Sequence, residues 1–173
     1  MLGQILKSAF LLLALIGLVY TILAATMGRA RILELCFGPA PVEAVDFGNL
    51  VLKETPNQYL VCPPEFRAAN AHAESPVFDE PVQSLKEKWF ALLERQPRTE
   101  LVHSDPENER YTFRVKTAVI HFPDDVTVQF IALGGKRSTL AIYSRSHYGH
   151  SDLGENRRRI ESWLRQLAAA APG

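Results

Sequence analysis

The residues of this chain whose side chains could do chemistry gather in one short stretch, Ser144 to Glu161. This stretch brings hydroxyls, imidazoles, carboxylates and guanidinium groups together around two glycines, at the start of a predicted helix. A helix N-terminus presents unpaired N–H groups and about half a positive charge, so these side chains could hold a carboxylate, a phosphate or a lipid headgroup there. The sequence therefore predicts an anion site formed by Arg145, Ser146, His147, Gly149, Ser151, Asp152, Gly154, Asn156, Arg157 and Arg159.

A purely structural interpretation explains the same residues. Asp152 is placed to cap the helix, and as a cap it would occupy the N–H groups that an anion needs. The arginines would then pair with Asp124, Asp125 or Glu161. The sequence leaves both interpretations open.

The stretch also resembles two kinds of catalytic site, but only in part. Residues 149–154 (GHSDLG) lie between a strand and a helix, as a G-x-S-x-G nucleophile elbow does, yet the second glycine comes one residue late and a carboxylate follows Ser151. His147, His150 and Asp152 offer metal-ligand chemistry, but turn residues this dense are usually exposed or bonded locally. We assign no catalytic residue, metal or cofactor, and keep a hydrolase that uses Ser151 as an alternative.

An apolar segment at the N-terminus determines where these residues are located. Twenty-one uncharged residues, Ser8 to Gly28, lie between Lys7 and Arg29, and as a helix they span about the 30 Å of a bilayer core. We expect residues 1–28 to form a transmembrane anchor in which residues 8–28 contact membrane lipid. A cleaved signal peptide, the main alternative, has a shorter apolar core of about 7–15 residues.

The rest of the chain predicts one water-soluble domain. Residues 29–55 lack a sustained period and form a connector, residues 56–168 form the domain, and residues 169–173 form a tail. Apolar residues at helical spacing over residues 82–93 predict a helix with Asp79 as its N-cap, and a period of two predicts strands. The expected strands are residues 57–62, 99–103, 111–116, 126–131 and 139–145. Residues 118–122 are expected to continue or restart the ladder of 111–116. A loop is expected over residues 65–80 and a turn at 123–125.

A final helix is expected over about residues 153–168, and its buried stripe would be Leu153, Ile160, Leu164 and Leu167. Because each helix has one apolar stripe and the strands have one apolar face, we predict a two-layer α+β fold. An antiparallel sheet of about five strands would be covered by two helices and preceded by one transmembrane helix. By analogy of order, helix-grip folds can open a cavity between such a sheet and its last helix.

The distribution of charge and the cysteine content limit the classes of partner and the redox states that we expect. The formal net charge is zero, but Glu34 to Glu109 carries fourteen acidic against six basic residues, and Arg110 to Gly173 carries ten basic against five acidic. This uneven distribution favours pairing within the fold. The basic half has no Lys/Arg run with interleaved aromatic residues, so we expect no nucleic-acid partner. Cys36 and Cys62 allow one disulfide if the domain is exported and two buried thiols if it is not.

Ser144 to Glu161 resembles the signature of a bacterial and plastid family of domains of unknown function, DUF1499. That signature has a serine- and arginine-rich strand, a Gly-x-Ser-Asp-x-Gly turn and an Asn-Arg-x-Arg helix start. Pro56-Asn57 and residues 122–126 (FPDDV) are similar to its early Pro-Asn element and its Phe-x-Asp-Asp turn, so the resemblance spans residues 56 to 167. Many members carry arginine where this chain has Tyr143 and His147; at any binding site formed by those arginines, Arg145 would have to substitute.

The resemblance implies a compact domain that is often placed beyond a membrane, and it implies no reaction. One basic residue, Lys7, precedes the apolar segment and two, Arg29 and Arg31, follow it, and this difference does not determine the orientation. The family resemblance favours export of the domain to the periplasmic side. The first functional expectation is a module that binds a small anionic or lipid ligand at the turn before the last helix. The alternatives are a scaffold that docks another membrane protein, and the hydrolase.

Overall fold

The computed structural model describes residues 1–64, 66 and 70–170. Within it the chain divides into two compact units, Met1–Ala40 and Pro41–Gly173. The predicted connector over residues 29–55 therefore consists of a helical part in the first unit and a coil, residues 41–55, that belongs to the second. We call this second part the connector coil.

The first unit contains the predicted apolar helix. Helix α1 (Leu2–Met27) is long and apolar enough to cross a membrane, and Gly28 separates it from α2 (Arg29–Phe37). The hydroxyls of Thr21 and Thr26 donate to the carbonyls of Leu18 and Ile22, at 2.7 and 2.9 Å. These bonds satisfy the side chains within the helix, as a lipid environment requires.

The second unit is built on a six-stranded sheet in the order β2-β1-β6-β5-β4-β3. This confirms the predicted α+β class, although the sheet is mixed because β1 and β2 pair in parallel while all other neighbours are antiparallel. The short strand β2 lies in the stretch that we predicted to be loop. The strands are β1 (Gln58–Cys62), β2 (Ala73–Glu74), β3 (Thr99–Asp105), β4 (Arg110–Lys116), β5 (Pro123–Ala132) and β6 (Ser138–Ser146), with a 3-10 turn at Pro106–Asn108.

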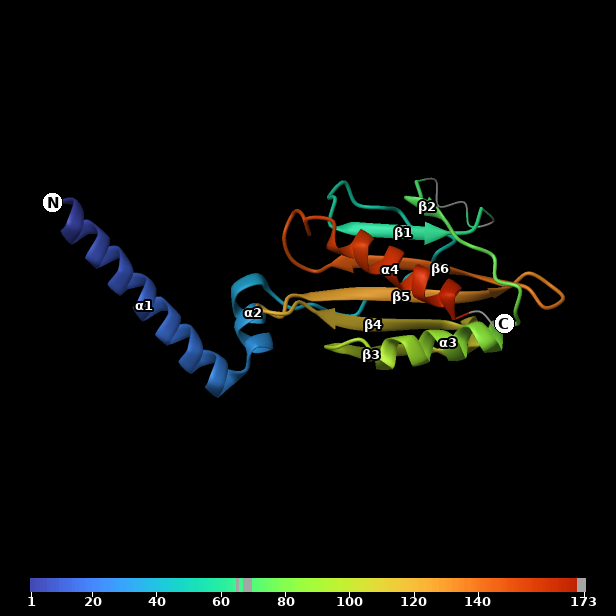
Figure 1. The fold of residues 1–173 in the computed structure, drawn as a ribbon, viewed down its shortest axis with the longest axis horizontal. Coiled ribbons are helices and arrows are strands. Elements are labelled where there is room, and N and C mark those ends of the chain that lie inside the picture. Colours follow the sequence, from blue (N-terminus) through green and yellow to red (C-terminus); the bar gives the residue numbers. More distant parts are fainter. Residues whose placement is uncertain (65, 67–69, 171–173) are drawn as a thin grey trace. The chain divides into compact units, whose positions relative to one another are not determined.

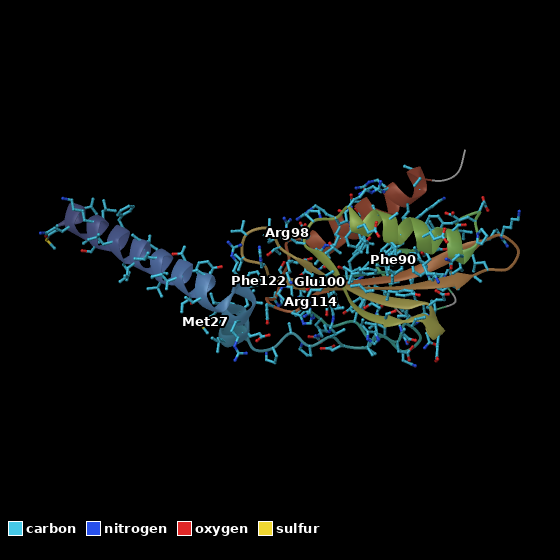
Figure 2. The ribbon with its side chains drawn as sticks, turned by 90° about the horizontal axis from the view of Figure 1, so that it is seen from below. Met27, Phe90, Arg98, Glu100, Arg114 and Phe122 are labelled. Atoms are coloured by element: carbon cyan, nitrogen blue, oxygen red, sulfur yellow. The ribbon has the colours of Figure 1, made fainter. Side chains whose placement is uncertain are left out.

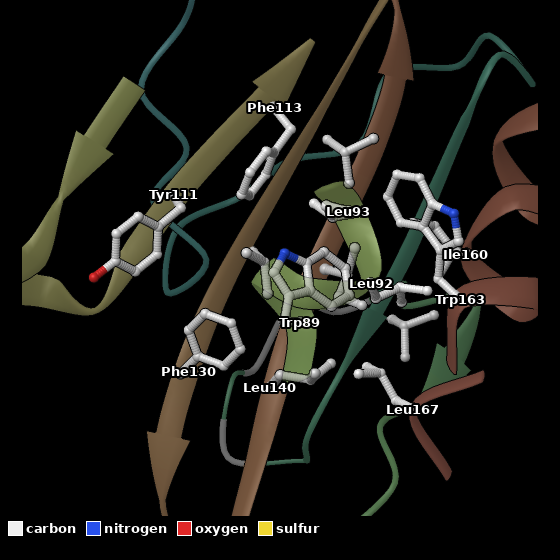
Figure 3. Close-up of a cluster of buried hydrophobic side chains, with 14 of the residues drawn as sticks. Trp89, Leu92, Leu93, Tyr111, Phe113, Phe130, Leu140, Ile160, Trp163 and Leu167 are labelled. Carbon is white, nitrogen blue, oxygen red and sulfur yellow. The ribbon is translucent and has the colours of Figure 1, made fainter. Parts of the chain in front are cut away.

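Helices α3 (Val82–Glu94) and α4 (Glu155–Ala169) cover one face of the sheet (Figure 1). Trp89 is completely buried between them, and its ring meets that of Trp163 edge to face at 5.6 Å (Figure 3). Phe113 and Phe130 of the sheet complete this aromatic cluster. Side chains thus fill the space where the helix-grip analogy suggested a cavity.

The connector coil covers the opposite face of the sheet. Figure 2 shows the helices on one side of the sheet and this coil on the other. Val45 and Phe47 are 6% and 1% exposed and pack with strand residues that point away from the helices. These strand residues are Leu60, Cys62, Ala141 and Tyr143. The sheet is therefore buried on both faces, with a second, smaller hydrophobic cluster under the coil.

Four local predictions are wrong. Residues 118–122 are the connection between β4 and β5, and residues 123–125 begin β5 rather than forming a turn. Pro123 is tolerated because it is the first residue of the strand. Asp79 does not cap α3, whose N-cap is Pro81. Leu153 is 84% exposed because α4 begins only at Glu155, and Trp163 occupies the core in its place.

Replacing Phe47 tests whether the connector coil is part of the folded domain. Phe47→Ala removes a buried ring and should lower the free energy of unfolding by about 3 kcal/mol or more. Val51→Ala in the same coil is the matched control, because Val51 is 85% exposed, and its effect should stay within about 0.5 kcal/mol. Urea unfolding followed by the fluorescence of Trp89 and Trp163 measures both values. Equal, negligible effects would contradict the packing of the coil.

Candidate functional site

Two adjacent carboxylates at the start of β5 organise the polar part of the domain. Successive side chains of a strand point to opposite faces, so Asp124 points toward α4 and Asp125 toward the face covered by the connector coil. Both carboxylates are 3% exposed. Each therefore requires partners of its own, and the sequence supplies a different set on each face.

On the helix face, Asp124 pairs with Arg159 of α4, with Nη2 and Oδ2 2.5 Å apart. The same guanidinium donates to Asn156 Oδ1 and Ser144 Oγ, at 2.6 and 3.1 Å. Asn156 is completely buried. Its side-chain amide donates to the carbonyl of Asn57, the residue before β1, and to Ser146 Oγ, both at 3.0 Å. Burial raises the pKa of Asp124, although Arg159 and Ser146 act in the opposite direction. This network fixes the first turn of α4 to the sheet.

On the coil face, Asp125 accepts two hydrogen bonds from Arg114 of β4, from Nε at 2.8 Å and Nη2 at 3.0 Å. His147 Nε2 lies 2.7 Å from the second carboxylate oxygen. Burial alone would raise the pKa of Asp125, but the bonds with His147 and Arg114 outweigh it, so the pKa lies below its ordinary value. The pKa shifts of the two carboxylates thus have opposite directions, because burial outweighs the partners of Asp124 but not those of Asp125.

The start of α4 is used for local structure. The Asp152 carboxylate accepts from the N–H groups of Gly154 and Asn156, at 3.0 and 2.7 Å. Arg157 pairs with Glu161 at 2.7 Å. Ser151 Oγ accepts from the Leu153 N–H at 3.2 Å and belongs to an exposed residue. At the start of α4 the contacts therefore agree with the structural interpretation, in which Asp152 takes the helix N–H groups and the arginines pair with carboxylates.

A pocket of about 180 Å³ lies on the coil face, beside the end of β6. Of the ten residues predicted for the anion site, this pocket brings together Arg145, Ser146, His147 and Gly149. The other six lie outside its lining: Ser151, Asp152, Gly154, Asn156, Arg157 and Arg159. The remaining lining residues, which were not among the ten residues predicted for the anion site, are Lys53, Thr55, Asn57, Gln58 and Tyr143.

Hydrogen bonds hold the walls of this pocket in place. Gln58 donates to the carbonyls of Lys53 and Thr55, at 2.6 and 3.0 Å, and accepts from Tyr143 Oη at 2.6 Å. Asn57 donates to the carbonyl of Gly149 at 2.7 Å. The connector coil, β1 and the loop after β6 are thereby linked around one cavity.

Arg145 is the central charged group of the pocket. Its side chain is 9% exposed, and Nη1 donates to the carboxylate of Glu43 at 2.5 Å. Among the residues that the structure describes, Nη2 has no hydrogen-bond partner. The bond with Arg145 lowers the pKa of Glu43, and the charges of Arg145, Lys53 and His147 lower it further. One half of a buried guanidinium fork is thus engaged by the Glu43 carboxylate, and the other half, Nη2, is buried without a partner among the described residues.

The pocket residues outside β6 could be found from sequence only in part. Asn57 falls in the Pro-Asn element, but nothing in the spacing of Lys53 or Thr55 places a coil residue beside Arg145. Within the described part of the chain, no group of three or more His, Cys, Asp and Glu residues could hold a metal ion. Cys36 is an exposed free thiol, whereas Cys62 is buried, and burial raises its pKa.

The Asp125 network should be important for stability and sensitive to acid. Asp125→Asn leaves Arg114 and His147 without their anion and should lower the free energy of unfolding by about 2–4 kcal/mol near neutral pH. Because the pKa of Asp125 is lowered by folding, its contribution is complete above the unfolded-state pKa of about 3.9 and is lost as the pH falls through the folded-state value. The difference between the two proteins should therefore narrow below about pH 4.

Urea unfolding at a series of pH values measures this difference. Asp79→Asn, at an exposed aspartate, is the control and should leave stability unchanged at every pH. A constant difference between wild type and Asp125→Asn down to the most acidic pH would contradict the assignment.

Comparison with known proteins agrees with the resemblance noted in the sequence. The family model described as a protein of unknown function, DUF1499, matches residues 52–167, which include α3, nearly all of α4, the whole sheet and the whole pocket lining. No curated protein matches the chain. The matched segment covers well over half of the chain, and the protein belongs to the DUF1499 family.

Proposed function

We propose that this protein is a membrane-anchored domain that binds a small oxyanion in the pocket at Arg145. The ligand chemistry is a phosphate or carboxylate group, either free or as part of a lipid headgroup. In this proposal helix α1 supplies the anchor, and the family resemblance favours the periplasmic side for the domain.

The observation that carries the proposal is the half-used guanidinium of Arg145. A buried donor without a partner costs about 1–3 kcal/mol, and more when it is charged. Arginine presents a planar fork that matches carboxylate and phosphate oxygens. An oxyanion in the pocket would accept a hydrogen bond from Nη2 while Glu43 keeps Nη1. Such a ligand would explain why Nη2 has no partner among the described residues.

The rest of the lining suits the same ligand. Lys53 adds an exposed lysine to the lining and Thr55 adds a hydroxyl, whereas the Ser146 hydroxyl accepts from Asn156 on the helix face. The pocket volume of about 180 Å³ lies below the roughly 300–1,000 Å³ of pockets that enclose drug-sized molecules. It therefore suits a single phosphate or carboxylate group, with any larger ligand body remaining outside.

Glu43 should compete with the ligand. Its carboxylate holds Nη1 of the Arg145 fork and so offsets part of the positive charge that attracts the anion. A bound anion would lie close to this negative charge. Removing the charge should therefore increase affinity, which distinguishes a ligand at Arg145 from one bound elsewhere.

Calorimetric titration of the full-length protein in detergent with inorganic phosphate tests the site. Arg145→Gln should weaken binding about tenfold or more, because a charge-assisted hydrogen bond contributes about 1.5–3 kcal/mol and each 1.4 kcal/mol is a factor of ten. Lys53→Gln, at an exposed position that cannot disturb the core, should weaken binding severalfold, and Glu43→Gln should strengthen it.

Arg158→Gln is the matched control, because it removes the same charge from an exposed residue of α4 outside the pocket. Binding that is unchanged in both Arg145→Gln and Lys53→Gln, or equally reduced in Arg158→Gln, would refute the proposal. A parallel titration with the phosphodiester headgroup glycerophosphoglycerol separates the two sources. Tighter binding of the diester indicates a lipid headgroup, and tighter binding of phosphate indicates a free anion.

A further inference from the structure

One end of the sheet carries exposed apolar side chains on two loops. Val119 and Ile120, in the loop between β4 and β5, are 78% and 43% exposed. Leu153, in the loop between β6 and α4, is 84% exposed. Leu153 also has a φ of 55°, a left-handed conformation that is costly for a side chain of this kind. Because the exposed side chain of Leu153 does not pack within the domain, its strained conformation favours a contact with a partner outside the domain.

The two loops leave the sheet side by side. Lys116 at the end of β4 is paired with Pro123, and Asp124 is paired with Ser146 at the end of β6. The rings of Phe122 and Tyr148 connect the loops, with centroids 6.1 Å apart. Figure 2 shows Phe122 at this end together with Arg114 and Glu100, while Phe90 lies farther along the domain. We call this the loop end of the sheet.

The chain also enters the domain at the loop end. Glu43, two residues after the domain begins at Pro41, pairs with Arg145, the residue before the last of β6. Residues 28–42 connect α1 to Glu43, and residues 29–37 of them are helical. With 1.5 Å per helical residue and about 3.5 Å per extended residue, this link reaches at most about 35 Å, whatever the orientation of the two units.

We infer that the loop end of the sheet contacts the surface of the lipid bilayer through Val119, Ile120 and Leu153. The inference rests on the proposed anchoring by α1, which keeps the loop end close to the bilayer and so makes even weak contacts frequent. Apolar side chains on loops gain free energy when they leave water for the boundary between headgroups and acyl chains. Arg158 donates to the Leu153 carbonyl at 2.8 Å, which places a cation beside the apolar tip, at headgroup level.

This arrangement would also place the anion pocket at the membrane surface. Arg145, His147 and Gly149 line the pocket at the same end of β6 from which the loops emerge. A phosphate of a lipid headgroup could then reach Arg145 without leaving the bilayer. Contact of the loops with lipid does not require an occupied pocket, so the two proposals can fail separately.

A fluorescent label on the loop end tests the contact in full-length protein. Val119→Cys in a Cys36→Ser background is labelled with a nitrobenzoxadiazole dye and reconstituted into liposomes of phosphatidylcholine and phosphatidylglycerol. Cys62 is 4% exposed and does not compete for the label. The matched control is Val77→Cys, because Val77 is 55% exposed and precedes Phe78, which pairs with Ser138 at the opposite end of β6.

Lipids with a nitroxide near the headgroup should quench the dye at position 119 several times more strongly than at position 77. The quenching should not change when the ratio of protein to lipid is lowered. Equal quenching at the two positions overturns the inference, and quenching that falls with protein density also does, since it indicates contact with a second copy.

Two further measurements separate this inference from the proposed function. Flotation of the liposomes reports anchoring by α1, independently of any contact of the loops. Arg145→Gln added to the Val119→Cys protein should weaken phosphate binding about tenfold or more and leave the quenching unchanged. Leu153→Asp, at an exposed position that does not affect the core, should reduce the quenching at position 119, and no reduction would contradict a shared contact surface.

Discussion

The structure depends on the alternation of side chains at one point of one strand, where Asp124 and Asp125 follow each other at the start of β5. Alternation sends the first carboxylate to the helix face and the second to the coil face, so each must be neutralised by a separate set of partners. Arg159 and its neighbours on the first face fix α4 to the sheet. Arg114 and His147 on the second face position the wall of the pocket in which Arg145 lies.

Much of the fold follows from patterns that are local in sequence. The period of 3.6 around Trp89 and the period of two in β4, β5 and β6 each report which side chains face the core, and the structure confirms two helices over an antiparallel meander. The short parallel pairing of β1 with β2 has no such signal, because it is two residues long. The position of the turn before β5 was misread because carboxylates at 124 and 125 look solvent-exposed until their distant partners are known.

The anion site shows more clearly that sequence patterns do not report contacts between distant segments of the chain. Spacing along the chain correctly singled out Asp152 as a group that takes helix N–H groups, and the pairs Arg159–Asp124 and Arg157–Glu161 were among those considered. The pocket depends instead on contacts between segments about 100 residues apart, such as Glu43 with Arg145 and Asn57 with Gly149. A connector coil without periodicity gives no sign that Phe47 fixes it to the sheet and brings Lys53 to the pocket.

The most direct test of this account is a site-resolved one. In nitrogen-15 spectra of the arginine side chains, addition of phosphate to the full-length protein should shift the guanidinium signal of Arg145 along a saturable curve, and the signals of Arg157 and Arg158 should stay in place. This is the expected result if the half-used fork of Arg145 receives the anion. Saturable shifts at Arg157 and Arg158 with no change at Arg145 would place the anion at the start of α4 and contradict the account.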